Sequence, residues 1–335
     1  MISIQQCVTP ASVRRLTTSV FAAAAAILFL TAPLQAQTAT IRIGHFPNIT
    51  HVQALVAHAL SRANKGWFEK RLGPDVKIEW YVYNAGPSAM EAVFAKSIDL
   101  TYVGPNPAIN AYSKSRGEEV RIVAGAADGG SALVVQGDST LKTPADFRGK
   151  KIATPQFGNT QDVAARAWLV AGGLAIRQSG GDAQVLPAAN PDQLSLFQQK
   201  QVDAVWTVEP WVSRLELEAK GRVLIDDRSA ITTVLVARVD YLRSQRDLVR
   251  KIVAAHAELT DWIKVNPVEA QKLAATELLA ETRATMSQQL IDRSWPRIVL
   301  TSSVSAEALT QFFKSAQAAG FLRDTPDLSR LVEMP

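Results

Sequence analysis

The sequence predicts an α/β protein with two lobes, each a mostly parallel sheet flanked by helices, and a helical C-terminal tail. Three observations favour this fold class. Short β-rich runs alternate with helical patterns, strand patterns stop beyond about Asp240, and one sequence pattern occurs in both halves of the chain without being a strict repeat. The two similar segments are FAKSIDLTYVG and LFQQKQVDAVWTV. In both, the end of a helix is followed by a short polar link, an Asp and an apolar strand. The length of 335 residues also favours two domains, at roughly 150 residues each.

Residues 1–36 have the pattern of a secretory signal peptide. Arg14 and Arg15 precede a short apolar run, Val20 to Leu30, and the segment ends at Ala36. The run is shorter than the roughly 20 apolar residues that span a membrane. We therefore expect cleavage after Ala36 and export to the periplasm.

The expected mature chain carries no cysteine, because Cys7 lies within the signal peptide. This excludes thiol redox chemistry and thiolate metal sites. Removing the two signal-peptide arginines lowers the net charge from +5 to +3. So mild a charge, spread without blocks, gives no reason to expect nucleic acid as a partner. No later segment is long and apolar enough to predict a membrane span.

The elements follow one another in a regular order. Strands are predicted, in sequence order, at IRIGHF, VKIEWYVY, DLTYVG, RIVAG, ALVVQG, KKIATP, AQVLPA, DAVWTV, RVLID and TTVLVAR. Helices are predicted near residues 51–70, 88–95, 108–115, 162–171, 191–199 and 211–219. In the tail, apolar residues recur at spacings of three and four, as in amphipathic packing helices. Strand-helix alternation implies sheets covered on both faces.

Two segments are candidates for the passages between the lobes. DGGSALVV, residues 128–135, places Gly-Gly directly before a strand, and SAITTVLVAR, residues 229–238, is the candidate return. The first lobe is then discontinuous. We expect it to comprise residues 40–130 and 238–335, and the second lobe to comprise residues 131–237.

Four strand-to-helix corners are polar without placing Lys or Arg at the turn. They are GHFPNITHVQAL, YNAGPSAMEAV, VGPNPAINAY and PQFGNTQDVAAR. Each offers capping residues, among them Asn48, Ser88 and Asn159, for the helix that follows. Ligands of open α/β sheets bind beyond the carboxyl ends of the strands. If the corners share one crevice, several helix N-termini point into it and suit an anion held without a formal counter-charge.

From Ile41 to about Tyr241 the sequence resembles the periplasmic substrate-binding proteins of nitrate, sulfonate and taurine ABC transporters. The resemblance is carried by IRIGHF, NAGPSAMEAVFAKSIDLTYVGPNPAINAY, RIVAG, LKTPADFRGKKIATPQFGNTQDVAARAWLVAGGL, VDAVWTVEPW and VLVARVDYL. It implies the type II periplasmic binding protein fold, in which two lobes close on a small oxyanion. It also implies a monomer without cofactor that delivers its ligand to an inner-membrane permease.

The corners and the resemblance together give a set of candidate ligand-binding residues. They are His45, Asn48, Gly86, Ser88, Asn106, Asn159, Thr160, Gln161, Trp206, Glu209 and Trp211. Glu209 is a carboxylate beside an expected anion site. It therefore either pairs with the ammonium group of a taurine-like ligand or bonds the opposite lobe as a latch. The ligand itself stays open among alkanesulfonate, aromatic sulfonate, taurine, nitrate and phosphonate.

Catalysis is the main competing interpretation, and the sequence disfavours it. The chain has no G-x-S-x-G elbow, Walker A loop or dinucleotide fingerprint. His51 and His58 are two helical turns apart, too far to chelate one metal on a straight helix, so no metal site is expected. Fungal thiamine-pyrimidine synthases share the fold but carry a cysteine-rich motif, which the mature chain would lack. A ligand-sensing receptor lobe remains a second alternative.

Overall fold

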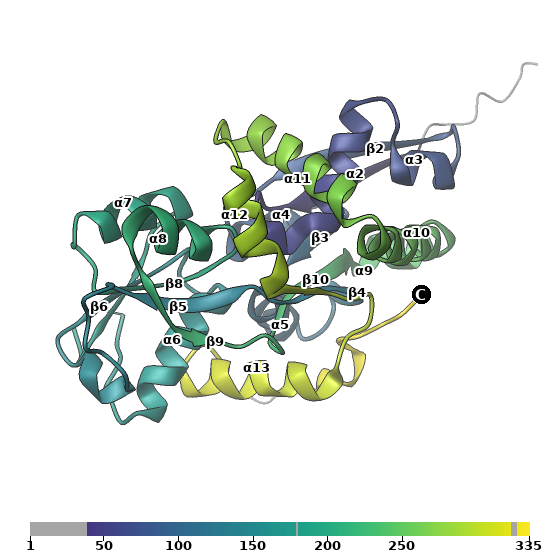
Figure 1. Ribbon diagram of the computed structural model, residues 1–335. Helices are drawn as coiled ribbons and strands as arrows, with labels where there is room; N and C mark the ends of the chain where they lie inside the picture. Colours follow the sequence, from purple (N-terminus) through teal and green to yellow (C-terminus); the bar gives the residue numbers. More distant parts are fainter. Residues whose placement is uncertain (1–38, 179, 323–326) are drawn as a thin grey trace, which may run out of the picture. The chain divides into compact units, whose positions relative to one another are not determined.

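The structure is a computed structural model that describes residues 39–178, 180–322 and 327–335 (Figure 1). These residues form two β-sheets flanked by helices, which confirms the predicted α/β fold class. The predicted signal peptide and Cys7 lie outside the described residues.

Each sheet combines parallel and antiparallel pairs. The first sheet has the spatial order β11 (Ile298–Leu300), β4 (Val120–Gly129), β10 (Ile231–Arg238), β3 (Leu100–Val103), β1 (Ala39–His45) and β2 (Val76–Val82). The second has the order β7 (Gln184–Pro187), β6 (Lys151–Thr154), β8 (Ala204–Val208), β5 (Ser131–Val135) and β9 (Arg222–Asp226). Strand β1 pairs parallel with β2 and β3, and β6 pairs parallel with β7 and β8. The other pairs are antiparallel. The sheets are therefore mixed rather than mostly parallel.

Helices connect the strands and form most of the C-terminal part. The α-helices are α2 (Val52–Arg62), α3 (Trp67–Leu72), α4 (Gly86–Phe94), α5 (Pro105–Lys114), α6 (Thr160–Ala171), α7 (Asn190–Gln198), α8 (Trp211–Ala219), α9 (Val239–Ser244), α10 (Arg246–Val265), α11 (Pro267–Thr282), α12 (Gln288–Ser294) and α13 (Ala306–Ala318). The 3-10 helices are η1 (Ile49–His51), η2 (Pro144–Phe147), η3 (Trp295–Arg297) and η4 (Leu328–Arg330).

The chain passes between the sheets twice. It leaves the first sheet at the end of β4 and enters the second at β5, through Gly129 and Gly130, which both have positive φ. Glycine adopts this conformation without the steric penalty of a side chain. The chain returns between β9 and β10. We call the six-stranded sheet with its helices the first lobe, and the five-stranded sheet with its helices the second lobe.

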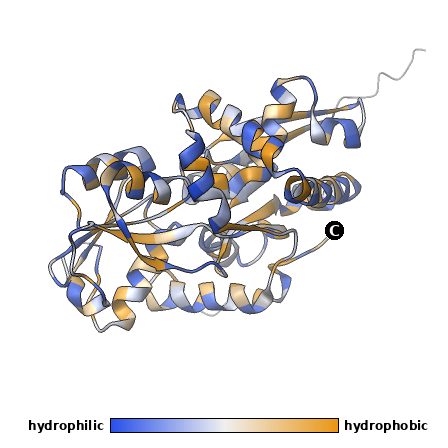
Figure 2. Cartoon of the chain, in the orientation of Figure 1, coloured by the Kyte–Doolittle hydropathy of each residue, from blue (hydrophilic) through white to orange (hydrophobic). Residues whose placement is uncertain are grey.

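Apolar clusters cover both faces of each sheet, and strands and inner helix faces are correspondingly hydrophobic (Figure 2). On one face of the first sheet, helices α2, α3, α10 and α11 contribute to a cluster that includes Phe68 and Leu259. On the other face, α4, α5 and α13 contribute to a cluster that includes Ile109 and Phe313. Helix α13 also packs against α6 of the second lobe, so it spans both lobes (Figure 1).

Three details differ from the sequence-based expectations. Helix α2 ends at Arg62 and α3 begins only at Trp67, because Asn64 takes a positive φ that interrupts the helix predicted over 51–70. Strand β11 occurs beyond Asp240, where no strand was expected. Strand β10 lies in the first sheet, whereas the predicted boundary grouped most of it with residues 131–237.

Candidate functional site

A small cavity lies where the two lobes meet, beyond the carboxyl ends of the parallel strands of both sheets. Its volume is about 30 Å³. It is lined by Phe46, Asn48, Thr50, His51, Asn84, Ala85, Gly86, Gly104, Pro107, Pro155, Asn159, Thr160, Gln161, Asn190, Val208 and Thr232. A cavity needs roughly 10–15 Å³ to hold one water molecule, so this cavity suits a small polar headgroup rather than a whole organic molecule.

Four helices begin at this cavity. Its lining includes the first residues of α4, α6 and α7, and the residue that precedes α5. The N-terminal residues of α4, α5 and α7 make no side-chain cap, whereas Asn159 caps α6 by accepting a hydrogen bond from the backbone N–H of Asp162. Helix N-termini carry partial positive charge and free N–H groups. Their convergence gives the cavity a positive potential.

The side chains around the cavity are neutral donors and acceptors. The cavity lining contains no Lys, Arg, Asp or Glu among the described residues. The Thr160 hydroxyl is buried without a hydrogen-bond partner, which is unusual for a native polar group and leaves a donor for a ligand. Burial, and to a lesser extent the nearby His45, hold the pKa of His51 well below its ordinary value, so His51 is uncharged at neutral pH.

The lobes touch around the cavity. Asn48 of the first lobe accepts hydrogen bonds from Asn190 Nδ2 at 3.4 Å and from Trp211 Nε1 at 3.2 Å, both of the second lobe. At Gly104, a Cβ atom would lie 2.3 Å from the Thr160 hydroxyl, so only glycine permits this approach. The structure therefore represents lobes closed on each other.

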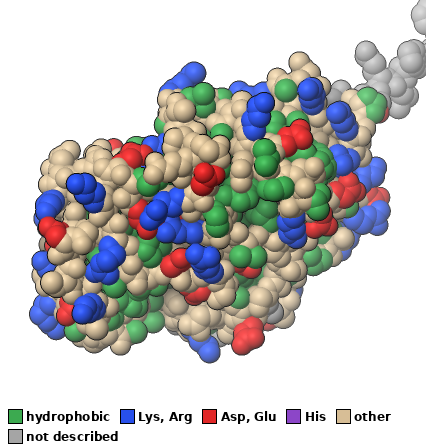
Figure 3. All heavy atoms as spheres, in the orientation of Figure 1, with side chains coloured by type: hydrophobic (Ala, Val, Ile, Leu, Met, Phe, Trp, Pro, Cys, Tyr) green, Lys and Arg blue, Asp and Glu red, His purple; other side chains and the backbone are tan. Residues whose placement is uncertain are grey.

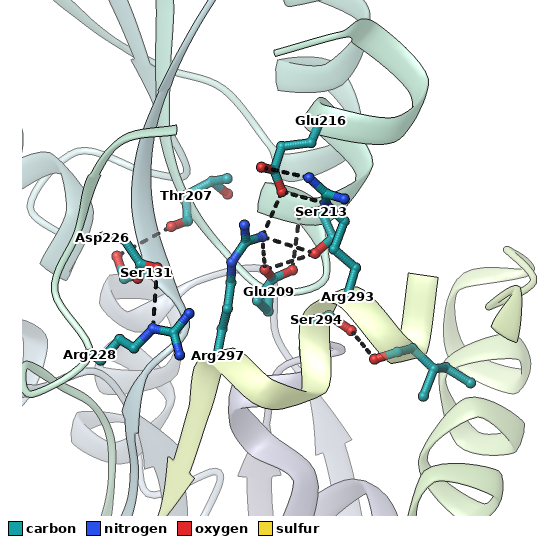
Figure 4. Close-up of polar contacts among 11 residues, drawn as sticks. Ser131, Thr207, Glu209, Ser213, Glu216, Asp226, Arg228, Arg293, Ser294 and Arg297 are labelled. Carbon is teal, nitrogen blue, oxygen red and sulfur yellow. Dashed lines mark hydrogen bonds and ion pairs between the residues drawn. The ribbon is translucent and has the colours of Figure 1, made fainter. Parts of the chain in front are cut away.

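A charged network, which we call the latch, joins the lobes beside the cavity (Figure 4). It comprises Glu209, Ser213 and Glu216 of the second lobe, Arg297 directly before β11 of the first sheet, and Arg293 on α12, which packs against α8. Arg297 donates to Glu209 Oε1 at 2.8 Å and to Glu216 Oε2 at 2.7 Å. Ser213 donates to both Glu209 oxygens, from its hydroxyl and its backbone N–H. Burial raises the pKa of Glu209, and the hydrogen bond from Arg297 partly offsets that rise.

A larger groove adjoins the cavity and shares Thr160, Gln161 and Thr232 with it. Its volume is about 500 Å³. Its walls carry apolar and aromatic side chains, with Trp168 and Trp206 on the second lobe and Phe312 on α13, and also polar ones, among them Gln311 and Asp227. The small polar cavity and the apolar groove together resemble a site for a molecule with a polar head and an apolar body.

The structure brings five of the predicted site residues to the cavity: Asn48, Gly86, Asn159, Thr160 and Gln161. Trp206 lies along the adjoining groove, and Trp211 contacts the cavity residue Asn48. Glu209 is fully buried in the latch, which corresponds to the latch alternative rather than to an ammonium partner.

Three predicted residues lie elsewhere. His45 turns away from the cavity, toward His58 and α11, because successive residues of a strand point to opposite faces. Asn106 donates to the Phe312 carbonyl in α13. Ser88 lies inside the first turn of α4, which starts at Gly86, and donates back to the Ala85 carbonyl rather than capping the helix.

Sequence reasoning missed Asn190, Gly104 and Arg297. Asn190 begins α7 at a strand-to-helix corner of the same kind as the others, so the corner pattern was a usable signal for it. Gly104 belongs to a predicted corner, but the sequence does not mark it as a ligand contact because glycine offers no polar side chain. Arg297 is 88 residues from Glu209 in sequence, and no local pattern pairs them.

Comparisons with known proteins agree with this geometry. The model of the NMT1-like family matches residues 34–279. A protein of Escherichia coli (strain K12), named as an aliphatic sulfonates-binding protein, is 27% identical over 254 residues, which cover 72% of this chain and 74% of that protein.

Solved structures show the same fold. The alkanesulfonate-binding protein SsuA from Xanthomonas axonopodis pv. citri, bound to MOPS, has a TM-score of 0.72 at 21% identity, covering 89% of this chain and 99% of that one. The periplasmic nitrate-binding protein NrtA from Synechocystis PCC 6803 has a TM-score of 0.66 at 14% identity, covering 85% and 83%. The periplasmic binding protein fold implied by the sequence is thereby confirmed. Within the described part of the chain, every helix is too short or too polar to cross a membrane.

Proposed function

The chain belongs to the NMT1-like family, and from that premise we propose that it is the periplasmic solute-binding component of an ABC importer. It captures a small organic oxyanion, best matched by an alkanesulfonate, between its lobes and delivers it to an inner-membrane permease without turnover. One observation carries this proposal: a headgroup-sized cavity lined by neutral donors and helix N-termini opens beside an apolar groove.

The cavity supports a monoanionic headgroup. Hydrogen bonds to a charged group are worth about 1.5–3 kcal/mol each, and the unpartnered Thr160 hydroxyl is positioned to supply one. Helix N-termini add favourable interaction with negative charge. A dianion would bring a second charge into a buried site whose described lining residues include no Lys or Arg to pair with it, and this disfavours a phosphonate.

The groove supports an organic tail. An alkyl chain that extends past Thr160 would contact Trp168, Trp206 and Phe312. Each methylene removed from water contributes about 0.8 kcal/mol. A taurine ammonium finds no partner in Glu209, because Arg297 and Ser213 already occupy that carboxylate.

Nitrate is the second candidate. It would fill the cavity without using the groove, and NrtA shares the fold. The two candidates differ in what the groove contributes to binding.

Calorimetry with a short and a long alkanesulfonate, the matching alkylphosphonates, taurine and nitrate tests the proposal. We expect affinity to rise with alkyl length, and the sulfonate to bind more tightly than the phosphonate of the same chain above neutral pH. Nitrate binding as tightly as the sulfonates, with no gain from chain length, would favour the second candidate. Tighter binding of the dianion would overturn the neutral-cavity argument, and recovery of a chemically altered ligand would overturn binding without turnover.

A further inference from the structure

A second buried polar cluster lies in the first lobe, and the proposed function does not use it. Its members are His45 at the end of β1, His58 in α2, and Glu277 and Glu281, one turn apart in α11. All four histidines of the chain are buried, and none is visible on the face shown in Figure 3. The cluster therefore joins three elements of one lobe through ionisable groups that are largely shielded from water.

Three atoms of this cluster form a compact triangle. His45 Nε2 lies 3.2 Å from His58 Nδ1 and 3.0 Å from Glu281 Oε1, and His58 Nδ1 lies 3.0 Å from the same Glu281 oxygen. In a tetrahedral zinc site with bonds of 2.0–2.1 Å, two ligand atoms are about 3.3 Å apart. The triangle thus has nearly the size of one face of such a site.

Hydrogen bonds alone do not satisfy the triangle. A ring nitrogen carries at most one hydrogen. If both ring nitrogens donate to Glu281, they face each other as two donors. If only one ring nitrogen donates to the ionised Glu281, the other ring nitrogen and Glu281 Oε1 face each other as two acceptors. A cation bound by all three atoms removes this conflict.

The surroundings favour the ligating forms of these side chains. His45 Nδ1 is 3.3 Å from the Phe46 carbonyl, and donation to that carbonyl leaves Nε2 free to ligate. The second Glu281 oxygen is buried and has no hydrogen-bond partner, so the carboxylate has unused capacity. The ring centroid of Trp80 lies 5.3 Å from that of His58 in a stacked geometry and 5.6 Å from that of His45 in a T-shaped geometry. These contacts fix both imidazole rings.

Glu277 has a separate role. Arg62 donates to both of its oxygens, at 2.8 and 3.0 Å, and its Oε1 lies 2.9 Å from His58 Nδ1. Arg62 therefore compensates the Glu277 charge, which leaves Glu281 as the carboxylate that completes the triangle.

The side chains of His45 and Glu281 are 0% and 1% exposed, so an unpaired charge there would be strongly disfavoured.

We propose that His45, His58 and Glu281 form a binding site for a divalent transition-metal ion, best matched by zinc, that ties α11 to β1 and α2. Two imidazoles and one carboxylate are a ligand set that zinc uses, with water in the fourth position. Sequence spacing does not indicate this site, because His51 and His58 are two helical turns apart in α2, whereas the structure brings His58 next to His45 from β1. The site is separate from the cavity, whose lining contains none of the three ligands.

Zinc titration of the purified, chelator-treated protein tests the proposal by calorimetry and by elemental analysis after dialysis. We expect one zinc ion per chain and a melting temperature that rises with zinc concentration, since the ion binds only the folded form. His58→Ala should weaken binding by at least about 100-fold, because outer-shell partners alone are worth roughly 10–100-fold. Glu281→Gln keeps the side-chain shape and should also weaken zinc binding. It tests the site even if the His58→Ala variant fails to fold.

His256→Gln is the matched control. His256 is a buried histidine of the same lobe, bonded to the Tyr102 hydroxyl and the Gly125 carbonyl and outside the cluster, so its loss should leave zinc stoichiometry at one. Cobalt substitution supplies a spectroscopic check, because a tetrahedral Co²⁺ ion absorbs in the visible range. No measurable zinc uptake by the folded wild-type protein would overturn the proposal, as would uptake unchanged in both His58→Ala and Glu281→Gln.

Discussion

The cavity and the latch both join the two lobes, but they do so with opposite chemistry. The cavity presents amide, hydroxyl and backbone groups without a charged side chain among its described lining residues. The latch instead buries two carboxylates against Arg297. The side chains of Glu209 and Glu216 are 0% and 10% exposed. One region is therefore neutral and the other is ionic.

The difference has a physical reason. In the latch, each buried charge has a partner of opposite sign within the same molecule whenever the lobes are closed. A ligand comes and goes, and a fixed cation in the cavity would be left buried and unpaired whenever the ligand is absent. Neutral donors avoid that penalty and still interact favourably with an anion. Each prediction below tests this contrast, beginning with the largest expected effect.

Removing the central cation of the latch should have the largest effect. Arg297→Met leaves Glu209 and Glu216 without their shared partner, and breaking a buried pair in this way typically costs about 3–5 kcal/mol. We expect the free energy of unfolding, measured by urea denaturation, to fall by about that amount.

The matched control is Arg293→Met. Arg293 pairs with Glu216 too, but its side chain is 45% exposed, and exposed pairs are worth about 1 kcal/mol or less. Equal and small losses in the two variants would mean that the latch is no more than a surface ion pair.

A buried titratable group with only neutral partners should respond to pH, unlike the compensated latch. Burial lowers the pKa of His256 to about 4, against an ordinary value of 6.5. The unfolded chain therefore binds more protons between these two values, so stability falls as pH decreases from about 6.5 to about 4. The total contribution is about 3 kcal/mol, at 1.36 kcal/mol per pKa unit.

The comparison of wild type with His256→Gln isolates this contribution. Burial raises the pKa of Asp128 to about 6, so Asp128 titrates in the opposite sense, but it is present in both proteins and cancels in the difference. A difference in unfolding free energy that stays constant across this pH range would contradict the prediction.

Removing one neutral donor from the cavity should weaken ligand binding without weakening the fold. Thr160→Val keeps the side-chain shape but deletes the unpartnered hydroxyl, so we expect sulfonate affinity to fall about ten- to a hundredfold, at about 1.5–3 kcal/mol for the lost bond. Calorimetry measures the change.

Thr233→Val is a close control, because its hydroxyl is also buried without a partner but Thr233 does not line the cavity. We expect wild-type affinity in this control, and in Ser88→Ala as well, since Ser88 lies outside the lining. Full affinity in Thr160→Val would mean that the strand-to-helix corners serve only the fold.

The sequence predicted the corners but not which of their side chains face the ligand. Strand ends, capping residues and prolines are local signals, and they located the helix starts that line the cavity. Orientation depends on the alternation along each strand and on distant packing. His45 and Phe46 are neighbours, yet only Phe46 lines the cavity. Arg297 and Glu281 belong to the C-terminal part, whose helical pattern indicates packing faces but not which distant groups they meet.

The smallest effect is expected from pH on anion binding, and it tests the neutrality of the cavity directly. His51 is the titratable residue in the described lining, and burial followed by the nearby His45 lowers its pKa. It is therefore uncharged from about pH 6 to about pH 8, and a sulfonate stays monoanionic throughout, so affinity should change less than about twofold. A His51 with its ordinary pKa would become cationic toward pH 6 and strengthen anion binding there. An alkylphosphonate is the internal control, because its own second ionisation falls near this range and should make its binding weaker as pH rises. Sulfonate affinity that climbs several-fold on acidification would show that the cavity acquires a positive charge, and the contrast with the latch would then fail.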